Sequence, residues 1–502
     1  MKVSLIYFDF PADPKAILEG WGFYSEGVAS ISTVLKKGGH KVSLLHLIKE
    51  IPKEKFLENM EKENPNLIGF SFTTDSFHRL PKYLKWIKEN KFNIPIICGS
   101  YHSTLAPEEV INIKEVDMVC IGEGEYPMLE LCDKIEKKEN YEYIESLWIK
   151  TKNGIIKNRV SPLVENLDTL PFPDFALFDL HNLIASKINT ATITISRGCP
   201  YNCSYCANHA IRKMYPNSTK YTRNRSPENS IEYIKTLLKH CKDKKININY
   251  IGFLDNNLSW PKEWSIKFLN LYLKEIHLPF SCNLRVDTID KELIELFKKA
   301  GCYRAHVGVE SGNKEIRFSI LKRNMPDDVI KNGFNLFKNA GISTLAYNII
   351  GLPYETPRTA LDTIKLNALI KPTRSLAAIF CPYPATEAYN ISLNAGFIGG
   401  HVDYSSEIVL KNKNFSEEQT RFFSLYFRFI MQIYKIIFVL PGSVKGVAEK
   451  FSDSLFTNDK IPYKFLNKIM RFYKQSSDSL KNKIRNKSPK LYLLLRNYFL
   501  KS

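Results

Sequence analysis

The sequence predicts an α/β protein with an N-terminal doubly wound parallel sheet, a second strand–helix region forming a partial barrel, and a helical C-terminal region. Three observations predict this fold. Short apolar runs alternate with amphipathic stretches over the first 140 residues, and the alternation resumes at 191 after a proline-rich connector. The last hundred residues change to long helical patterns. At about 150 residues per domain, a chain of 502 residues also suits roughly three domains.

In the first region, we expect buried strands at 3–8, 41–45, 67–72, 94–98 and 117–121, with helices at 27–37 and 77–90 between them. Ligands of such sheets bind beyond the carboxyl ends of the strands. The loops expected there are polar and contain glycine: residues 73–76, 99–102 and 122–125. Ordinary turn chemistry is the alternative explanation for these glycines. Neither a GxGxxG nor a GxxxxGKS motif is present, so nothing indicates a dinucleotide site or a P-loop.

A connector follows at 141–188, in which residues 147–158 predict a hairpin turning at Asn153-Gly154, and 170–174 predict an extended linker. We expect strands at 191–195, 249–254, 278–284, 303–308, 344–350 and 376–381 in the next region, 189–395, with helices near 227–240 and 261–273. Six strand–helix units of this kind favour a partial parallel barrel, with its chemistry at the C-terminal mouth.

The C-terminal region, 396–502, is basic. From Lys411 to the end there are 19 basic and 6 acidic residues, against a net charge of +19 for the whole chain. Residues 417–440 predict one amphipathic helix with a polar stripe. Such a helix either packs on its own domain or docks on a membrane or a lipid-like substrate.

Apolar residues at 44% and charged residues at 25% exclude a mostly disordered chain, and ten cysteines are too sparse for a disulfide-stapled scaffold. We find neither a targeting signal at the N-terminus nor an uncharged apolar run of roughly 18 residues. We therefore expect a cytoplasmic protein, in which clustered cysteines indicate metal or redox chemistry.

The most informative motif is Arg197-Gly198-Cys199-Pro200-Tyr201-Asn202-Cys203-Ser204-Tyr205-Cys206. Three thiols at CxxxCxxC spacing on one loop suit an iron–sulfur cluster, with Cys199, Cys203 and Cys206 as its ligands. Three ligands leave one iron open to a substrate or cofactor. Structural zinc is the alternative, but it requires a fourth ligand, for which His209 is the nearby candidate.

This loop, with Tyr205 before its last cysteine, resembles the signature of the radical S-adenosylmethionine (SAM) enzymes. Segments 251–257, 308–313, 348–356 and 382–386 resemble the family's later strand motifs in the same order. In the last segment, Ala385 stands where the family usually has glycine.

The N-terminal region resembles the cobalamin-binding subgroup of that family, in segments 99–109, 122–125 and 167–174. Two departures are visible. The Asp-x-His-x-x-Gly motif of many cobalamin proteins is absent, and Ser100 stands where many relatives have glycine. The missing motif fits cobalamin bound without a protein ligand to cobalt, or a relative that has lost cobalamin.

The resemblance implies a 4Fe–4S cluster, SAM and cobalamin as cofactors. SAM bound to the open iron would be cleaved to methionine and a 5′-deoxyadenosyl radical, while the protein orients and shields the cofactors. The positions implied for SAM are Tyr205, Asp255, Arg285, Glu310, Ser311, Lys322 (or Arg323), Asn348 and Gly351. Those implied for cobalamin are Thr73, Thr74, Ser100, His102 and Glu123, with a satisfied loop histidine as the alternative for His102.

The leading interpretation is a cobalamin-dependent radical SAM enzyme of the methylase class that C-methylates a small substrate. A lipid or isoprenoid would suit the greasy, basic C-terminal region, as would peripheral membrane contact. A flavodoxin or ferredoxin would supply electrons. The second interpretation is a radical SAM cyclase, oxidase or C–C bond-forming enzyme without functional cobalamin. The third, a basic nucleic-acid-binding metalloprotein, lacks a recognisable binding module, so no nucleic-acid partner is expected.

Overall fold

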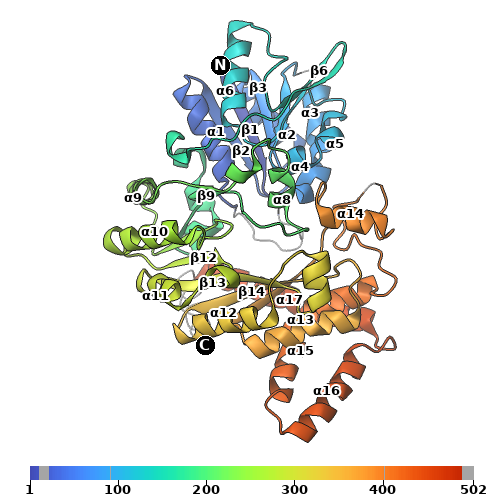
Figure 1. Ribbon diagram of the computed structural model, residues 1–502. Helices are drawn as coiled ribbons and strands as arrows, with labels where there is room; N and C mark the ends of the chain where they lie inside the picture. Colours follow the sequence, from blue (N-terminus) through green and yellow to red (C-terminus); the bar gives the residue numbers. More distant parts are fainter. Residues whose placement is uncertain (11–21, 91, 401, 489–502) are drawn as a thin grey trace. The chain divides into compact units, whose positions relative to one another are not determined.

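The computed structural model describes residues 1–10, 22–90, 92–400 and 402–488 (Figure 1). Its internal contacts divide the chain into two compact units. The first unit comprises Met1–Tyr201, Cys206–Ile248 and Tyr383–Thr386, and the second comprises Asn202–Tyr205, Asn249–Pro382 and Glu387–Ser502.

The first unit is built on a sheet of strand order β2-β1-β3-β4-β5-β6-β7. The strands are β1 (Lys2–Phe8), β2 (Lys41–Leu47), β3 (Leu67–Ser71), β4 (Ile96–Gly99), β5 (Met118–Cys120), β6 (Leu147–Thr151) and β7 (Gly154–Lys157). The first five pair in parallel, and β6 and β7 are antiparallel. All five predicted strands are confirmed. The order 2-1-3-4-5 is that of flavodoxin-like sheets, in which the order of the strands reverses between β1 and β3.

Helices alternate with these strands, as a parallel sheet requires. They are α1 (Glu26–Lys37), α2 (Lys53–Glu63), α3 (Leu80–Glu89), α4 (Tyr101–Leu105), α5 (Pro107–Ile111) and α6 (Glu125–Lys137). The strands read as continuous apolar runs because both faces of the sheet are covered. Ile6, Ile68, Phe70 and Ile96 are all at most 2% exposed and join one hydrophobic core with residues of α2 and α3.

The predicted hairpin of β6 and β7 is confirmed, but its turn lies one residue earlier than predicted, at Lys152-Asn153, because Gly154 already pairs with Thr151. The following linker runs over α1 and α9. Asp174 accepts a hydrogen bond from Ser32 Oγ at 2.7 Å, and the ring of Phe172 stacks on Tyr233 of α9 at 5.2 Å between centroids. The first unit also contains α7 (Ile184–Lys187), β8 (Thr190–Ile193), β9 (Ser196–Arg197), α8 (Ala207–Arg212), β10 (Arg223–Asn224) and α9 (Pro227–Asp243).

The second unit contains parallel strands in the order β15-β14-β13-β12-β11. Its strands are β11 (Tyr250–Phe253), β12 (Phe280–Leu284), β13 (Cys302–Glu310), β14 (Ser343–Ile350) and β15 (Arg374–Ile379). The helices after the first four are α10 (Lys262–Glu275), α11 (Lys291–Lys299), α12 (Asp327–Asn339) and α13 (Pro357–Ile370). Together with β8, the six strands predicted for the barrel region are therefore present in the chain.

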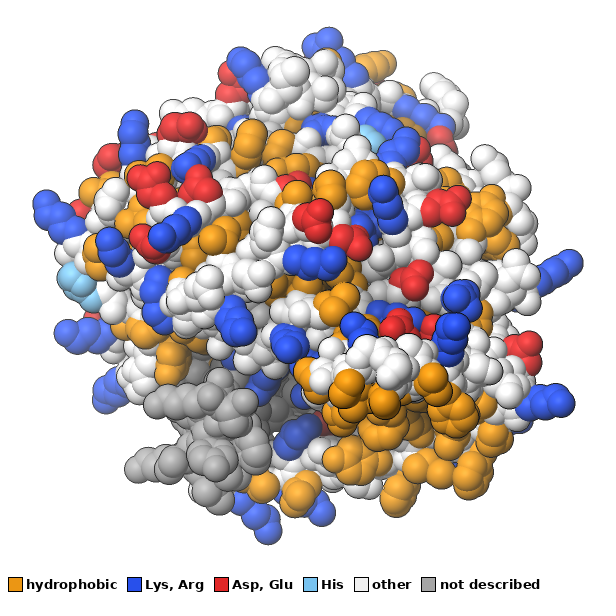
Figure 2. Space-filling model, turned by 60° about the horizontal axis from the view of Figure 1, so that its bottom comes forward, with side chains coloured by type: hydrophobic (Ala, Val, Ile, Leu, Met, Phe, Trp, Pro, Cys, Tyr) orange, Lys and Arg blue, Asp and Glu red, His pale blue; other side chains and the backbone are white. Residues whose placement is uncertain are grey.

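The remaining elements of the second unit are the helices α14 (Glu387–Asn394), α15 (Glu417–Ile437), α16 (Gly442–Phe456) and α17 (Tyr463–Lys487). The amphipathic helix predicted at 417–440 is confirmed as α15. Its buried residues, among them Phe423, Phe427, Ile430 and Tyr434, form a core with α13, so this face packs on its own domain. Other apolar side chains of α15–α17 are exposed, and Figure 2 shows hydrophobic side chains gathered at the lower right of the view. None of the described helices is both long and apolar enough to cross a membrane.

Candidate active site

The cysteine motif lies on the loop between β9 and α8. Gly198 opens the loop with a φ of 82°, and a side chain there would lie 2.4 Å from the carbonyl oxygen of Tyr221, so glycine is required. Cys203 is buried, whereas Cys199 and Cys206 are partly exposed, and none of these three cysteines forms a disulfide. In the described part of the chain, no three His, Cys, Asp or Glu side chains converge as a metal-holding group.

The start of this loop is fixed within the first unit by an ion network. Arg197 contacts Glu125 and, at 3.0 Å, Glu123, while Arg223 contacts Glu123 at 2.8 Å. Burial alone would raise the pKa of the Glu123 carboxyl, but Arg223 and Arg197 hold it below its ordinary value. Glu123, which we predicted to contact cobalamin, therefore uses its carboxylate to anchor the cysteine loop.

The end of the loop is also anchored in the first unit. Helix α8, which begins directly after Cys206, packs on α4 at the carboxyl end of β4. Tyr215 continues this contact, because its hydroxyl accepts a hydrogen bond from the Glu123 backbone N–H at 3.1 Å. The same hydroxyl lies 2.3 Å from where a side chain at Gly122 would begin, so only glycine fits there. The predicted cobalamin loops thus support the cysteine loop directly.

The middle of the loop, Asn202–Tyr205, belongs to the second unit, where two guanidinium groups meet Cys203. Arg285 Nη1 and Arg323 Nη1 each lie 3.7 Å from Cys203 Sγ. Arg285 is held by Asp287, with contacts of 2.9 and 2.7 Å, and Arg323 donates to the Gly308 carbonyl at 2.6 Å. Arg323 also lies 3.5 Å from the Tyr205 hydroxyl. Two buried cations around one sulfur create a site for an anionic group.

Glu310 adds a buried carboxylate beside these cations. It ends β13 with a φ of 66°, where the register with β14 shifts between Gly308 and Glu310. A bulge of this kind re-aims a side chain out of the regular alternation of a strand. Glu310 is 9% exposed, and burial raises its pKa despite the opposing effects of Arg323 and the Tyr205 hydrogen bond. A carboxylate that is buried and desolvated in this way is typical of a ligand-binding site.

Arg317 is a positioning residue that the sequence reasoning missed. It lies on a π-helical turn, Ile316–Ile320, with its side chain 0% exposed. Its guanidinium donates to the Ser311 carbonyl and the Met325 carbonyl, both at 2.8 Å, and also contacts Asp327. It therefore joins the segment after Glu310 to the segment that carries Arg323. A fully buried arginine has no sequence signal that separates it from an exposed one. The signal that marks Arg317 is structural: it lies on a π-helical turn, and such turns are frequent at functional sites.

Lys322 and Arg323 are adjacent in the sequence, but their side chains point in different directions. Lys322 has a φ of 50°, and its side chain is 47% exposed and contacts Glu387. Arg323 is 5% exposed and faces Cys203. The structure thus brings Arg323, the alternative, to the cysteine and places Lys322 in a surface ion pair.

The other residues implied for SAM lie at strand ends of the second unit. Asp255 follows β11 and is 1% exposed. The side-chain oxygen of Asn348 on β14 accepts a hydrogen bond from Asn367 Nδ2 on α13 at 2.6 Å. Its amide therefore helps to hold helix α13 against the sheet. Ser311 is buried, and its backbone carbonyl accepts a hydrogen bond from the Arg317 guanidinium.

Gly351 begins the loop after β14 with a φ of 83°. Its N–H donates to Glu355 Oε2 at 2.6 Å, and Leu352 N–H donates to the same oxygen at 3.2 Å. Glu355 is 0% exposed, and burial raises the pKa of its carboxyl to about 8 although both N–H groups oppose this. The Glu355 carboxyl, which we had not predicted, therefore holds the loop in place by accepting these two backbone hydrogen bonds.

The residues implied for cobalamin follow β3 and β4 of the first sheet. His102 is 0% exposed, its ring lies 4.1 Å from that of Phe77, and its Nδ1 lies 3.3 Å from Thr74 Oγ1. Its Nε2 lies 3.5 Å from Glu109 Oε2, so both ring nitrogens face side chains of the first unit. Thr73 starts the turn with its hydroxyl 3.3 Å from that of Ser76. Ser100 precedes α4 with φ 82° and ψ −166°, a conformation that glycine adopts far more readily.

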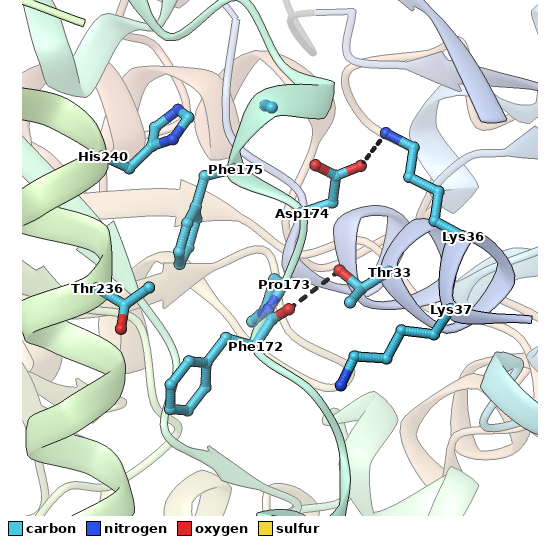
Figure 3. A pocket seen from close by; sticks show the side chains of 10 residues that line it. Thr33, Lys36, Lys37, Phe172, Pro173, Asp174, Phe175, Thr236 and His240 are labelled. Atoms are coloured by element: carbon cyan, nitrogen blue, oxygen red, sulfur yellow. Dashed lines mark hydrogen bonds and ion pairs between the residues drawn. The ribbon is translucent and has the colours of Figure 1, made fainter. Parts of the chain in front are cut away.

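A surface hollow in the first unit lies between α1, the linker and α9 (Figure 3). Its polar groups already pair with one another: Lys36 contacts Asp174 at 2.6 Å, and Thr33 Oγ1 donates to the Phe172 carbonyl at 3.0 Å. None of the predicted cofactor-binding residues or cysteine ligands lines it, so it is not part of the candidate site.

Comparison with known families agrees with this arrangement. The Radical SAM superfamily model matches residues 193–366, and the B12-binding-domain model matches residues 23–132. The chain therefore contains a Radical SAM domain and a B12-binding domain. Its N-terminal sheet is the B12-binding domain, and the cysteine loop opens the radical SAM domain. These domains imply a 4Fe–4S cluster, SAM and cobalamin as cofactors.

Several characterised or named relatives are similar over most of this enzyme. An uncharacterized methyltransferase of Pyrococcus horikoshii is 26% identical, covering 89% of this chain and 98% of that protein. The anaerobic magnesium-protoporphyrin IX monomethyl ester cyclase of Rubrivivax gelatinosus is 23% identical, covering 78% and 69%. The hopanoid C-3 methylase of Methylococcus capsulatus is 23% identical, covering 72% and 68%.

Among solved structures, the cobalamin-dependent SAM radical enzyme OxsB, with aqua-cobalamin and SAM bound, superposes with a TM-score of 0.66. The match covers 100% of this chain and 75% of OxsB at 17% identity, so it shows a shared fold.

The residues around Cys203 fit the implied cofactors. An iron–sulfur cluster bound by thiolates is anionic, and SAM carries a carboxylate, so the guanidinium groups of Arg285 and Arg323 complement both. The buried Glu310 offers acceptor oxygens for hydroxyl or amino donors. The site therefore has the charges that a cluster with bound SAM requires.

Proposed function

We propose that this enzyme C-methylates an unactivated carbon of a small, lipid-like substrate. The observation that carries the proposal is the group of Arg285, Glu310 and Arg323 around Cys203, in a chain that also has a B12-binding domain. When bound, the reduced cluster supplies the electron that cleaves SAM, and cobalamin carries the methyl group.

The residues of this chain have distinct roles in the proposal. Arg323 binds the SAM carboxylate, because it is buried beside Cys203, and Arg285 offsets negative charge on the other side of that sulfur. Glu310 accepts from the ribose hydroxyls. Asp255, at the end of β11, accepts from the SAM amino group. Glu355 keeps the loop at Gly351 in position for adenine through two backbone N–H bonds.

Two features support a lipid-like substrate. Large apolar side chains are exposed beyond the carboxyl ends of strands of the second unit: Leu254 after β11 is 54% exposed, and Tyr354 after β14 is 53% exposed. Apolar groups at such positions suit a hydrophobic ligand. A hopanoid methylase is also among the similar proteins. A substrate of this kind would bring the enzyme close to a membrane surface.

An oxidative cyclase is the second candidate, since the chain is as similar to the protoporphyrin ester cyclase as to the hopanoid methylase, at 23% identity in both cases. In either case, a flavodoxin or ferredoxin is the proposed electron donor.

The test begins with anaerobic reconstitution of the full chain with iron, sulfide and hydroxocobalamin, followed by desalting and visible spectroscopy. We expect both cluster and corrin absorption, with only the cluster absorption lost in Cys199→Ala. The loaded enzyme is then incubated with methyl-labelled SAM, a reductant and lipid extracts. A methylase yields 5′-deoxyadenosine, S-adenosylhomocysteine and a labelled lipid. A product formed without transfer of label would favour the cyclase, and retention of the cluster without corrin would exclude the cobalamin-dependent reaction.

A further inference from the structure

The C-terminal helices carry exposed apolar stripes on the side away from their domain core. On α16, Val444, Val447, Phe451 and Leu455 recur at helical spacing and are 46–72% exposed. Phe465, Ile469, Phe472, Tyr473 and Leu480 form the equivalent stripe of α17 and are 49–73% exposed. We call these nine residues the apolar face. Scattered exposed apolar residues are normal, but two consecutive helices with continuous stripes mark an interaction surface.

Polar contacts on the opposite side of α16 fix its orientation. Lys365 of α13 contacts Glu449 at 2.9 Å and Asp453 at 2.7 Å, and the Tyr434 hydroxyl of α15 donates to Asp453 at 2.6 Å. Rotating α16 to bury its apolar stripe would break all three contacts and leave Lys365 without these acids. The stripe on α16 is therefore held outward.

Helix α17 is fixed in the same way. Asn467, which is 2% exposed, donates to the Glu418 carboxylate of α15 at 2.7 Å, and the Tyr426 hydroxyl donates to the Leu466 carbonyl at 2.8 Å. The buried side chain of Tyr463 packs in the core of this domain. Phe465, Ile469 and Phe472 lie on another face of the helix, so the domain core cannot cover them.

The same helices are strongly basic. Residues 441–488 contain 11 basic and 4 acidic residues. Two of the four acidic residues, Glu449 and Asp453, already form salt bridges with Lys365. Along α17, Lys464, Lys468 and Lys474 alternate in sequence with residues of the apolar stripe, while Arg471 contacts Glu407. An apolar stripe with basic flanks is the pattern of a helix that lies in the interface of an anionic membrane.

We propose that the apolar face of α16 and α17 docks this enzyme on the surface of an anionic lipid bilayer. The apolar side chains enter the headgroup region, and the flanking lysine and arginine side chains contact lipid phosphates. Figure 2 shows hydrophobic side chains gathered at the lower right of the view. The proposal concerns a surface and not the cofactor site, so it does not depend on the proposed methylation.

Charge favours the bilayer over two other occupants. A second copy of the chain docked by a two-fold axis would place two basic faces together, which is unfavourable. Residues 489–502 contain three basic and no acidic residues, so their charge would not neutralise the basic helices. An anionic bilayer neutralises this charge.

The test is co-sedimentation of the reconstituted full chain with vesicles of phosphatidylcholine alone, or with about a third phosphatidylglycerol. We expect retention on the anionic vesicles only. The double variant Phe451→Glu/Phe472→Glu should weaken it at least about tenfold, because two large side chains lose their apolar burial and repel the lipid phosphates. The matched control is Tyr143→Glu, a substitution at a 74% exposed residue of the first unit, which should bind as the unsubstituted chain does.

A second measurement separates this proposal from folding defects and from the proposed function. Formation of 5′-deoxyadenosine without vesicles should be unchanged in the double variant, which shows an intact site. Equal binding of the double variant and the unsubstituted chain would overturn the proposal, as would equal binding to both vesicle types. A dimer in sedimentation velocity that the double substitution abolishes, without any vesicle binding, would identify a second copy as the occupant instead.

Discussion

The two parallel sheets of this enzyme end differently at their carboxyl edges. In the first unit, the groups at this edge contact one another: the His102 ring lies 4.1 Å from that of Phe77, and Glu123 is shared by Arg197 and Arg223. In the second unit, Arg285 and Arg323 instead meet at Cys203, with Glu310 buried nearby. At the first edge the charged groups pair with one another, whereas at the second edge two cations meet at the sulfur of Cys203.

The difference follows from local backbone irregularity. The second sheet has a bulge at Glu310, a π turn at Ile316–Ile320 and a left-handed residue at Lys322, which together redirect consecutive side chains. In the first sheet, the comparable irregularity is Ser100. Unusual backbone conformations are tolerated where surrounding contacts hold them and a site benefits. The comparison can be tested by substitution at each edge.

The largest effect is expected for Arg323→Met. Removing the cation that faces Cys203 should lower the rate of 5′-deoxyadenosine formation by roughly a hundredfold, because a charge-assisted contact to SAM is lost. Lys322→Met is the matched control, since its ion pair is half-exposed, and it should change the rate less than about twofold. Chromatographic quantification of 5′-deoxyadenosine measures both.

Arg323→Lys keeps the charge and should recover part of the rate. If Lys322→Met were the impaired variant and Arg323→Met active, the assignment of Arg323 to the SAM carboxylate would be wrong. Thermal unfolding of each variant shows whether loss of rate reflects loss of the fold.

A smaller, pH-dependent effect is expected at Glu355. Burial raises the pKa of this carboxyl from its ordinary value of 4.5 to about 8, so between these values the folded chain holds a proton that the unfolded chain has released. Its contribution to stability is complete at the acid end of this range and is lost as the pH rises through 8. The free energy of unfolding should therefore fall by up to roughly 1.4 kcal/mol per pH unit.

Glu355→Gln removes this titration, so its unfolding free energy, from urea titrations across the same pH range, should fall less steeply. Glu61→Gln, at an exposed position, serves as the control and should follow the unsubstituted chain. Parallel pH profiles for all three proteins would mean that Glu355 does not hold a proton in the folded state.

The smallest effect is expected at the first edge. Ser100→Gly should stabilise the chain by about 1 kcal/mol, because glycine adopts the backbone conformation of this residue with little strain. Ser103→Gly, three residues on within α4, should instead destabilise by about 1 kcal/mol, since glycine weakens helices. Thermal unfolding measures both signs. Destabilisation by Ser100→Gly would show that a serine contact outweighs the strain.

Much of the fold could be predicted because apolar periodicity is local. The strands at 3–8 and 344–350, the hairpin within 147–158 and the helix from 417 are all present. The π turn, the bulge at Glu310 and the pairing of β9 with β10 were not predicted, because they depend on contacts between distant segments.

The cysteines were selected from their spacing and Arg285 from its strand end, whereas Glu310 and Asp255 came from the resemblance to radical SAM motifs; their roles toward a cofactor stay predictions. The roles of Glu123 and His102 could not be separated from ligand binding, since a loop carboxylate and a loop histidine look the same whether they face a ligand or the interior. Arg317 and Glu355 were not predicted, because burial of a charged side chain leaves no trace in composition.

The sequence by itself determined the cofactor chemistry and the strand framework of this enzyme, because thiol spacing and apolar periodicity act over a few residues. Only the tertiary structure decided which of two adjacent cations faces the cysteine. Lys322 has a left-handed backbone and points to Glu387, while Arg323 turns inward to Cys203, a choice made by the turn that Arg317 supports from the interior.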